Sequence, residues 1–141
     1  MFNLLAENLN FGEGPRWHND KLWFSDFYQH AVLTVDLNGN IEKIVDIPNQ
    51  PSGLGWLPNG DLLIVSMLDR KIMKYSNNAL TLHSDLSELT PFRCNDMVVD
   101  RDGHAYVGNF GSLHHAKDVK PTCIIHIDPD GNANIAARKL D

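Results

Sequence analysis

The stretch GLGWLPNGDLLIVS, residues 53–66, decides the fold of this protein. It holds two short apolar runs, and each run is too short for a stable helix. Between them stands Pro58-Asn59-Gly60. Proline presets its own φ angle, and asparagine and glycine tolerate the positive φ that tight turns require. The stretch therefore predicts a β-hairpin.

The hairpin pattern occurs three times along the chain. Residues 14–25 and 95–108 also consist of two short runs around a polar turn. The small residues that close the second run of each repeat, Ser25, Ser66 and Gly108, are 41 and 42 residues apart. A period of this length is typical of propeller blades or of helical arrays.

Strand composition separates these two architectures. Each hairpin is followed by a third short run, a polar turn and a fourth short run, for example 31–35 and then 41–47 in the first repeat. The runs are rich in β-branched and aromatic residues, which favour strands. Four antiparallel strands per repeat are the signature of a β-propeller, so we expect an all-β fold of four-stranded blades.

The number of repeats predicts an incomplete ring. A closed propeller requires roughly four to eight blades, and this sequence contains three repeats. We therefore interpret residues 1–141 as one partial propeller domain, the N-terminal half of a larger ring. Leu4-Leu5-Ala6 is the candidate strand for completing a final blade. Blade faces without a neighbour expose apolar surface, so we also predict self-association.

The composition narrows the classes of partner. With 43% hydrophobic and 21% charged residues, the chain is typical of a soluble globular protein. A net charge of −6 and scattered Lys and Arg argue against a nucleic-acid partner. No apolar run approaches membrane-spanning length, so we expect no membrane partner.

The termini and the cysteines indicate the compartment. Residues 1–10 carry Glu7 and no basic residue, unlike a secretion signal or a transit peptide. Cys94 and Cys123 have no metal-ligand spacing, and two thiols do not make a disulfide framework. We therefore expect a cytoplasmic protein with two reduced, largely buried cysteines.

Polar residues before the first strand of each repeat indicate a site. Because the first strands of neighbouring blades begin at one rim of a propeller, we expect Glu13, Ser52 and Asn95 to occupy equivalent places there, close to Arg93. Carboxylate and amide oxygens are ligands that a hard cation such as calcium prefers. The loops between second and third strands open on the same rim and add Asp26, Asn109 and the His114-His115 loop.

Four strings carry a resemblance to a known family: GEGPRW (12–17), KLWFSDF (21–27), PSGLGWLPNGDLLIVSMLDR (51–70) and RCNDMVVDRDGHAYVGNFG (93–111). Over nearly its whole length, the chain resembles the senescence marker protein, gluconolactonase and luciferin-regenerating enzyme family. The resemblance implies a six-bladed propeller with a divalent metal in its channel, usually calcium, with zinc or magnesium as alternatives. It also implies hydrolysis of a small-molecule substrate, a sugar lactone or a related cyclic ester.

The resemblance also implies roles for three residues. Glu13 matches the family's metal-binding glutamate, and Arg93 and Asn95 match the arginine and asparagine of an R-x-N-D motif that holds the substrate. The family's other metal ligands are an asparagine and an aspartate that also serves in catalysis, and their positions would follow Asp141. No catalytic residue is therefore assigned, and we expect the chain to be inactive by itself.

Structural alternatives remain open for these residues. Glu13 also suits a polar turn, and Arg93 also suits a surface ion pair with Asp96. Asp96 suits the capping of neighbouring backbone amides, and the D-x-D-G pattern at 100–103 suits a hairpin turn more than a calcium loop. The alternative function is a noncatalytic propeller that serves as a binding or scaffold module, because one fold hosts many functions.

Overall fold

The structure is a computed structural model that describes residues 4–112 and 119–140. Within these residues the strands form three four-stranded antiparallel sheets. The first sheet has the order β1-β2-β3-β4 and consists of β1 (Gly12–His18), β2 (Lys21–Asp26), β3 (Ala31–Val35) and β4 (Ile41–Asp46). The second has the order β5-β6-β7-β8 and consists of β5 (Pro51–Trp56), β6 (Leu62–Ser66), β7 (Lys71–Ser76) and β8 (Ala79–Asp85). The third has the order β12-β11-β10-β9 and consists of β9 (Cys94–Val99), β10 (Ala105–Asn109), β11 (Thr122–Ile127) and β12 (Ala133–Leu140).

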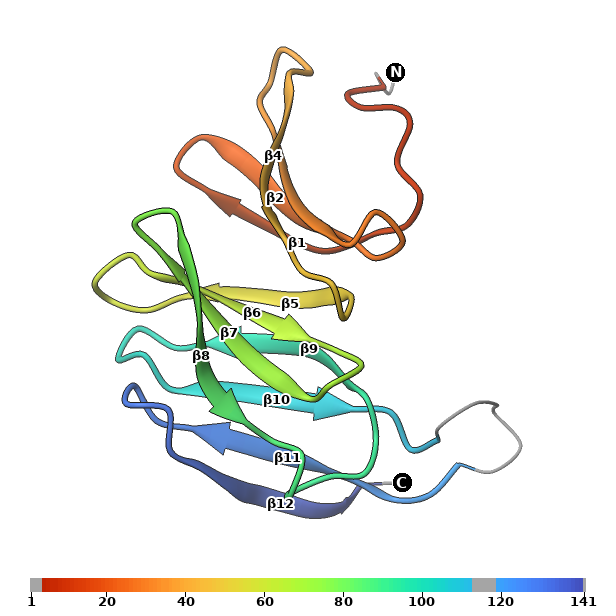
Figure 1. Ribbon diagram of the computed structural model, residues 1–141, viewed down its shortest axis with the longest axis vertical. Helices are drawn as coiled ribbons and strands as arrows, with labels where there is room; N and C mark the ends of the chain where they lie inside the picture. The colour runs from red at the N-terminus through yellow and green to blue at the C-terminus, as the bar shows by residue number, and fades with distance from the viewer. Residues whose placement is uncertain (1–3, 113–118, 141) are drawn as a thin grey trace.

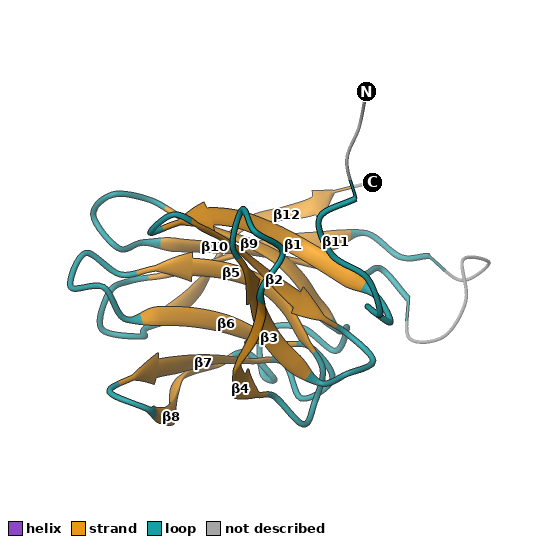
Figure 2. Cartoon of the chain, turned by 90° about the horizontal axis from the view of Figure 1, so that it is seen from above, coloured by secondary structure: helices purple, strands orange, loops and turns teal. Residues whose placement is uncertain are grey.

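These three sheets are the blades that the repeats predict, and the all-β propeller architecture is confirmed. The first strand of each sheet, β1, β5 or β9, faces the first strand of the neighbouring sheet (Figure 1). Figure 2 shows that strands and loops make up the described chain, in which no helix is long and apolar enough to cross a membrane. We call β1, β5 and β9 the inner strands, and we call the end of the sheets at which they begin the rim.

Glycines allow the second and third inner strands to approach each other closely. A Cβ atom on Gly53 would lie 2.3 Å from the Met97 amide nitrogen, and one on Gly55 would lie 2.3 Å from Cγ2 of Val99. Neither distance is compatible with a side chain, so β5 fits against β9 only because these positions are glycine. The GLG sequence at 53–55 therefore determines how tightly the inner strands pack.

The predicted turn chemistry is present at the end of the blades opposite the rim. Asn19 and Asp20 have φ angles of 49° and 59° between β1 and β2. Asn77 and Asn78 have φ angles of 49° and 59° between β7 and β8. Asparagine and aspartate tolerate this left-handed region better than other non-glycine residues.

Apolar side chains fill the spaces between neighbouring blades. One cluster joins the second and third blades around Leu63, Val65, Met97 and Val107, all of which are buried. Another joins the first and second blades around Val32, Leu54 and Ile64. The blades are therefore held together by core contacts as well as by the chain connections.

The N-terminal segment that contains Leu4-Leu5-Ala6, the candidate strand for a final blade, has no strand partner among the three described blades. Residues 4–9 have no strand assignment, and Ala6 packs against the cluster of Phe24, Ala31, Leu33 and Val35 on the first blade. Strand formation requires a paired edge, and within the described residues this segment has none. Instead, it lies as an irregular chain over an apolar face of the first blade.

The strand register corrects one alignment of the repeats. Trp17 pairs with Leu22 in the first blade, and Trp56 pairs with Leu62 in the second, because the second turn is one residue longer. Consequently, the residues at the ends of the second strands, Asp26, Ser66 and Asn109, are the equivalent ones. The earlier alignment of Ser66 with Ser25 and Gly108 was therefore wrong by one position.

Candidate functional site

The structure places Glu13, Ser52 and Asn95 at matching positions in the three inner strands. Each is the second residue of its strand, so they lie within the strands rather than before them as the sequence analysis expected. The Ser52 hydroxyl donates a hydrogen bond of 3.1 Å to Oδ1 of Asn95. A Cβ atom on Gly14, next to Glu13, would lie 3.1 Å from the Ser52 carbonyl oxygen. We call Glu13, Ser52 and Asn95 the rim row.

A β-bulge interrupts each inner strand at the rim row. The register shifts between Glu13 and Arg16 in β1 and between Pro51 and Leu54 in β5. The third shift lies between Cys94 and Met97 in β9, which pair with Asn109 and Val107 of β10. A bulge bends its strand and redirects the side chains around it, and bulges are common beside functional sites. The repetition of the bulge sets the rim row apart from the regular ladders that follow it.

The carboxylate of Glu13 is incompletely paired. Its Oε1 atom is buried, and no hydrogen-bond donor lies within reach among the described residues. Leaving a buried polar atom without a partner costs free energy, and such atoms are rare in folded proteins. A cation would satisfy this oxygen, so the structure of Glu13 fits a metal ligand better than a turn residue. Among the described residues, however, no group of three or more His, Cys, Asp or Glu side chains comes together.

The repeat pattern predicts Ser52 only as an equivalent position, and the structure gives it a local role. Its hydroxyl holds Oδ1 of Asn95, and its carbonyl oxygen accepts a 2.6 Å hydrogen bond from the Ser25 hydroxyl. Ser25 and Ser52 are both buried. The asparagine amide is therefore oriented by a chain of hydrogen bonds from the first blade through the second. The repeat alignment was the only sequence signal for this role.

Arg93 lies on the same rim, one residue before β9. Its backbone carbonyl accepts a 2.9 Å hydrogen bond from the Phe110 amide. Its side chain does not form the ion pair with Asp96 that the structural alternative proposed. Arg16 takes that place, with its Nη2 atom 2.8 Å from Oδ1 of Asp96.

Asp96 caps the backbone as predicted. Its Oδ1 atom accepts a 2.8 Å hydrogen bond from the Met97 amide, in addition to the contact from Arg16. Arg16 also donates a 2.8 Å hydrogen bond to the Met97 carbonyl, which ties the first blade to the third. Asp96 is therefore a structural residue that stands next to the rim row.

The other predicted rim residues have structural contacts. Both oxygens of the buried Asp26 carboxylate are occupied, because they accept hydrogen bonds from the amides of Asn10, Phe11 and Gln29 and from the Gln29 side chain. The amide nitrogen of Asn109 donates a 2.8 Å hydrogen bond to the Cys123 carbonyl. Asp26 therefore stabilises the loops around it, and Asn109 links β10 to β11. His114 and His115 lie outside the described residues.

Two further expectations are confirmed by local geometry. Oδ1 of Asp100 accepts hydrogen bonds of 3.0 Å from the amides of Asp102 and His104, which is the contact pattern of a hairpin turn. These bonds hold the pKa of Asp100 below its usual value. Cys94 and Cys123 are free and buried, and burial raises the pKa of Cys94 to about 12, so this thiol stays protonated.

The comparisons with known proteins agree with this architecture. Residues 11–141 match the SMP-30/gluconolactonase/LRE-like region. The fold is similar to that of regucalcin, a calcium-binding protein from Agrobacterium tumefaciens, with a TM-score of 0.73 and 20% identity over 94% of this chain and 44% of that one. It is also similar to a gluconolactonase from Xanthomonas campestris, with a TM-score of 0.75 and 19% identity over 95% of this chain and 50% of that one.

Both solved structures have about twice the length of this chain. At such low identity they establish the fold, whereas the sequence match over residues 11–141 establishes the family. The chain belongs to the SMP-30/gluconolactonase/LRE-like family.

Proposed function

We propose that the rim row is part of the site of a metal-dependent hydrolase that opens sugar lactones or related cyclic esters. In this proposal Glu13 is a metal ligand, and Arg93 and Asn95 bind the substrate. The observation that carries it is the buried, unpaired Oε1 atom of Glu13, which stands in the same row as the oriented amide of Asn95. Family membership and the gluconolactonase fold support the reaction class.

The proposed metal is calcium. Calcium takes six to eight oxygen ligands, and carboxylates and amide carbonyls are typical among them. Glu13 supplies such an oxygen, and the similar regucalcin structure is described as a calcium-binding protein. When bound, a divalent cation supplies Lewis acidity, which polarises an ester carbonyl and lowers the pKa of a bound water.

The side chains of Asn95 and Arg93 would position the lactone. Because Ser52 donates to Oδ1 of Asn95, the NH₂ group of that amide is on the opposite side and is available to donate to a substrate oxygen. Arg93 offers a guanidinium with five N–H donors, which suits sugar hydroxyls and the negative charge that develops on the carbonyl oxygen. Preorganisation of Asn95 by Ser52 avoids the cost of orienting the amide during the reaction.

The described residues supply only some of the ligands and binding groups that such a site needs. Glu13 is the one carboxylate in the rim row, and the chain spans about half the length of the solved relatives. We propose that residues 1–141 act as a partial propeller domain and that full activity needs blades beyond these three. A cytoplasmic location and self-association through open blade faces stay predictions.

Calcium titration of the purified chain tests the metal role of Glu13. We expect weak, saturable binding by isothermal titration calorimetry and at least about tenfold weaker binding in Glu13→Gln, since a carboxylate ligand becomes a neutral amide. Glu42→Gln is the matched control, because Glu42 is an exposed carboxylate on β4 that contacts Lys21. Equal calcium binding by the Glu13→Gln variant and the unmodified chain would exclude the proposed role.

The second candidate function is a noncatalytic binding module. This function suits the isolated chain, because the rim row has one carboxylate, Glu13, and no second acidic group to act as a base. Hydrolysis of D-glucono-δ-lactone by a longer gene product that contains these residues distinguishes the two functions. The lactonase proposal predicts calcium-dependent activity that Arg93→Ala reduces. A longer product that binds calcium but leaves the lactone intact supports the binding module.

A further inference from the structure

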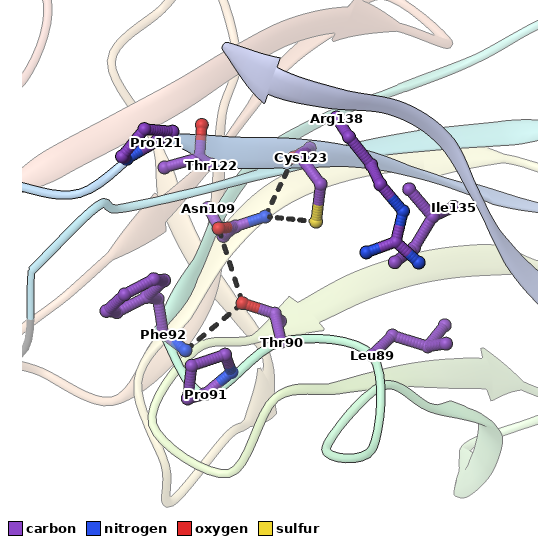
Figure 3. Close-up of a pocket in the computed structure, with 10 residues that line it drawn as sticks. All are labelled: Leu89, Thr90, Pro91, Phe92, Asn109, Pro121, Thr122, Cys123, Ile135 and Arg138. Atoms are coloured by element: carbon purple, nitrogen blue, oxygen red, sulfur yellow. Dashed lines mark hydrogen bonds between the residues drawn. The ribbon is translucent and has the colours of Figure 1, made fainter. Parts of the chain in front are cut away.

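A cavity of about 280 Å³ lies between the second and third blades on the outer side of the rim. One wall is the connection between β8 and β9, with Leu89, Thr90 and Phe92. The other wall comes from the third blade, with Cys123 on β11 and Arg138 on β12 (Figure 3). None of these residues belongs to the rim row.

The wall formed by Thr90, Asn109 and Cys123 is rigid and internally satisfied. The Thr90 hydroxyl accepts a 3.1 Å hydrogen bond from the Phe92 amide and donates a 3.3 Å hydrogen bond to Oδ1 of Asn109. The amide of Asn109 in turn donates to the carbonyl and the sulfur of Cys123, at 2.8 and 3.5 Å. The cavity is therefore formed before any ligand arrives, which lowers the entropic cost of binding.

The remaining lining combines an apolar surface with one cation. Leu89, Phe92 and Ile135 contribute apolar side chains. The guanidinium of Arg138 extends from β12 beside Ile135 and Cys123 (Figure 3). Among the described side chains, no carboxylate lies within ion-pair distance of Arg138. A preformed apolar cavity with a guanidinium in its wall suits a small anion with an apolar body.

We propose that this cavity binds a small carboxylic acid, with its carboxylate on Arg138 and its apolar chain against Leu89, Phe92 and Ile135. A guanidinium matches a carboxylate with two parallel N–H donors, which makes this pairing stronger than one to a neutral oxygen. The site is separate from the rim row, so the proposal does not depend on the lactonase function.

The two cysteines provide a built-in measurement. Cys123 lines the cavity and is 9% exposed, whereas Cys94 is fully buried in the core. Alkylation by iodoacetamide, followed by mass spectrometry of the peptides, should therefore modify Cys123 first. Hexanoate is the probe, and hexan-1-ol is its uncharged counterpart. We expect hexanoate to slow the alkylation of Cys123 in a saturable manner and hexan-1-ol to have a much weaker effect.

Variants at two arginines test the anion contact. Arg138→Ala should weaken the hexanoate protection by at least about tenfold, the effect of losing a charged hydrogen-bond partner. Arg101→Ala is the control, because Arg101 is exposed and lies outside the cavity lining, and it should retain full protection. Continued resistance of Cys94 to alkylation shows that each variant keeps its fold.

Each other outcome overturns part of the proposal. Equal protection by hexan-1-ol, or undiminished protection by hexanoate in Arg138→Ala, excludes the carboxylate contact. Absence of any protection at saturating hexanoate excludes the site. Calcium binding at Glu13 is measured separately, so failure here leaves the lactonase proposal standing and the reverse also holds.

Discussion

The two ends of the inner strands are built differently although they belong to the same strands. At the rim, all three inner strands are bulged, and the buried Oε1 atom of Glu13 lacks a partner. At the opposite end the ladders are regular and aromatic rings pack closely. The His18 and Trp56 rings stack with centroids 4.0 Å apart, and Trp23 meets Trp56 edge to face at 5.4 Å.

From this difference we expect the aromatic end to contribute mainly to stability and the rim mainly to ligand binding. At the aromatic end, Nε1 of Trp23 donates to the His18 carbonyl at 3.0 Å, and the buried Oγ1 atom of Thr34, which pairs with Trp23, has no partner among the described residues. The rim differs because its inner strands are bulged and because the unpaired atom there belongs to a carboxylate. Bulges are common beside functional sites, and a buried carboxylate oxygen without a donor is costly unless a ligand satisfies it. Changes at the aromatic end should therefore reduce stability, and changes at the rim should reduce ligand binding.

The largest expected effect comes from Trp56→Ala. Trp56 contacts His18 and Trp23 and packs against the core between the first two blades, so we expect a loss of about 3 kcal/mol in the free energy of unfolding. Urea denaturation followed by circular dichroism measures this loss. The weak calcium binding that we propose for Glu13 should remain under conditions where the variant is folded.

Trp17→Ala is the matched control for Trp56→Ala. Trp17 has the corresponding register position in β1, because it pairs with Leu22 as Trp56 pairs with Leu62. It is 55% exposed, so its removal should cost less than about 1 kcal/mol. Similar losses in both variants would contradict the assignment of a stabilising aromatic cluster to the first two blades.

A smaller effect on stability is expected from Ser52→Ala at the rim. The variant loses the hydrogen bond to Oδ1 of Asn95, which joins the second and third blades, at a cost of about 1 kcal/mol, and keeps the backbone carbonyl that accepts from Ser25. The main change should be in ligand binding, because the amide of Asn95 becomes free to rotate. Under the lactonase proposal, the activity of a longer product that contains these residues should fall with little change in melting temperature. A fall in melting temperature with unchanged activity would assign Ser52 a structural role only.

The smallest expected effect is a pH dependence that originates at the aromatic end. Burial lowers the pKa of His18 below its ordinary value of 6.5. The unfolded chain therefore binds a proton more readily, so the stabilisation is present above about pH 6.5 and is lost as the pH falls through the lower folded pKa. Melting temperatures from about pH 8 to about pH 5 should decline less in His18→Gln than in the unmodified chain.

His83 contributes to the same pH dependence, so His18→Gln should remove only part of it. Burial also lowers the pKa of His83, on β8, so part of the decline should persist in His18→Gln. His83→Gln measures this second contribution. Identical pH profiles for the unmodified chain and both variants would mean that neither imidazole couples to folding.

Much of the fold could be predicted because its signals are local. Turn residues such as Pro58-Asn59-Gly60 and short apolar runs depend only on neighbours in the chain, and their repetition predicts blades. The exact alignment of the repeats could not be predicted, since it depends on the different lengths of the two hairpin turns. The path of residues 4–9 over the first blade likewise depends on a contact with distant residues.

The candidate site was predictable in part. Glu13 and Asn95 were placed on a common rim from the repeat pattern, and the structure brings their strands together through Ser52. The pairing of Asp96 with Arg16 instead of Arg93 was not predictable, because these residues are 80 positions apart and belong to different blades. The outer cavity at Arg138 gave no sequence signal, since its walls come from four separate segments.

The sequence by itself determined the strands, the turns, the three repeats and the family, because each of these depends on residues close together in the chain. Only the tertiary structure decided which polar groups find partners. Asp26 accepts hydrogen bonds from loop amides and Asn109 donates to β11, whereas Glu13 keeps a buried oxygen without a donor. The physical reason is that hydrogen bonding and desolvation depend on distances between blades, which the strand pattern does not specify.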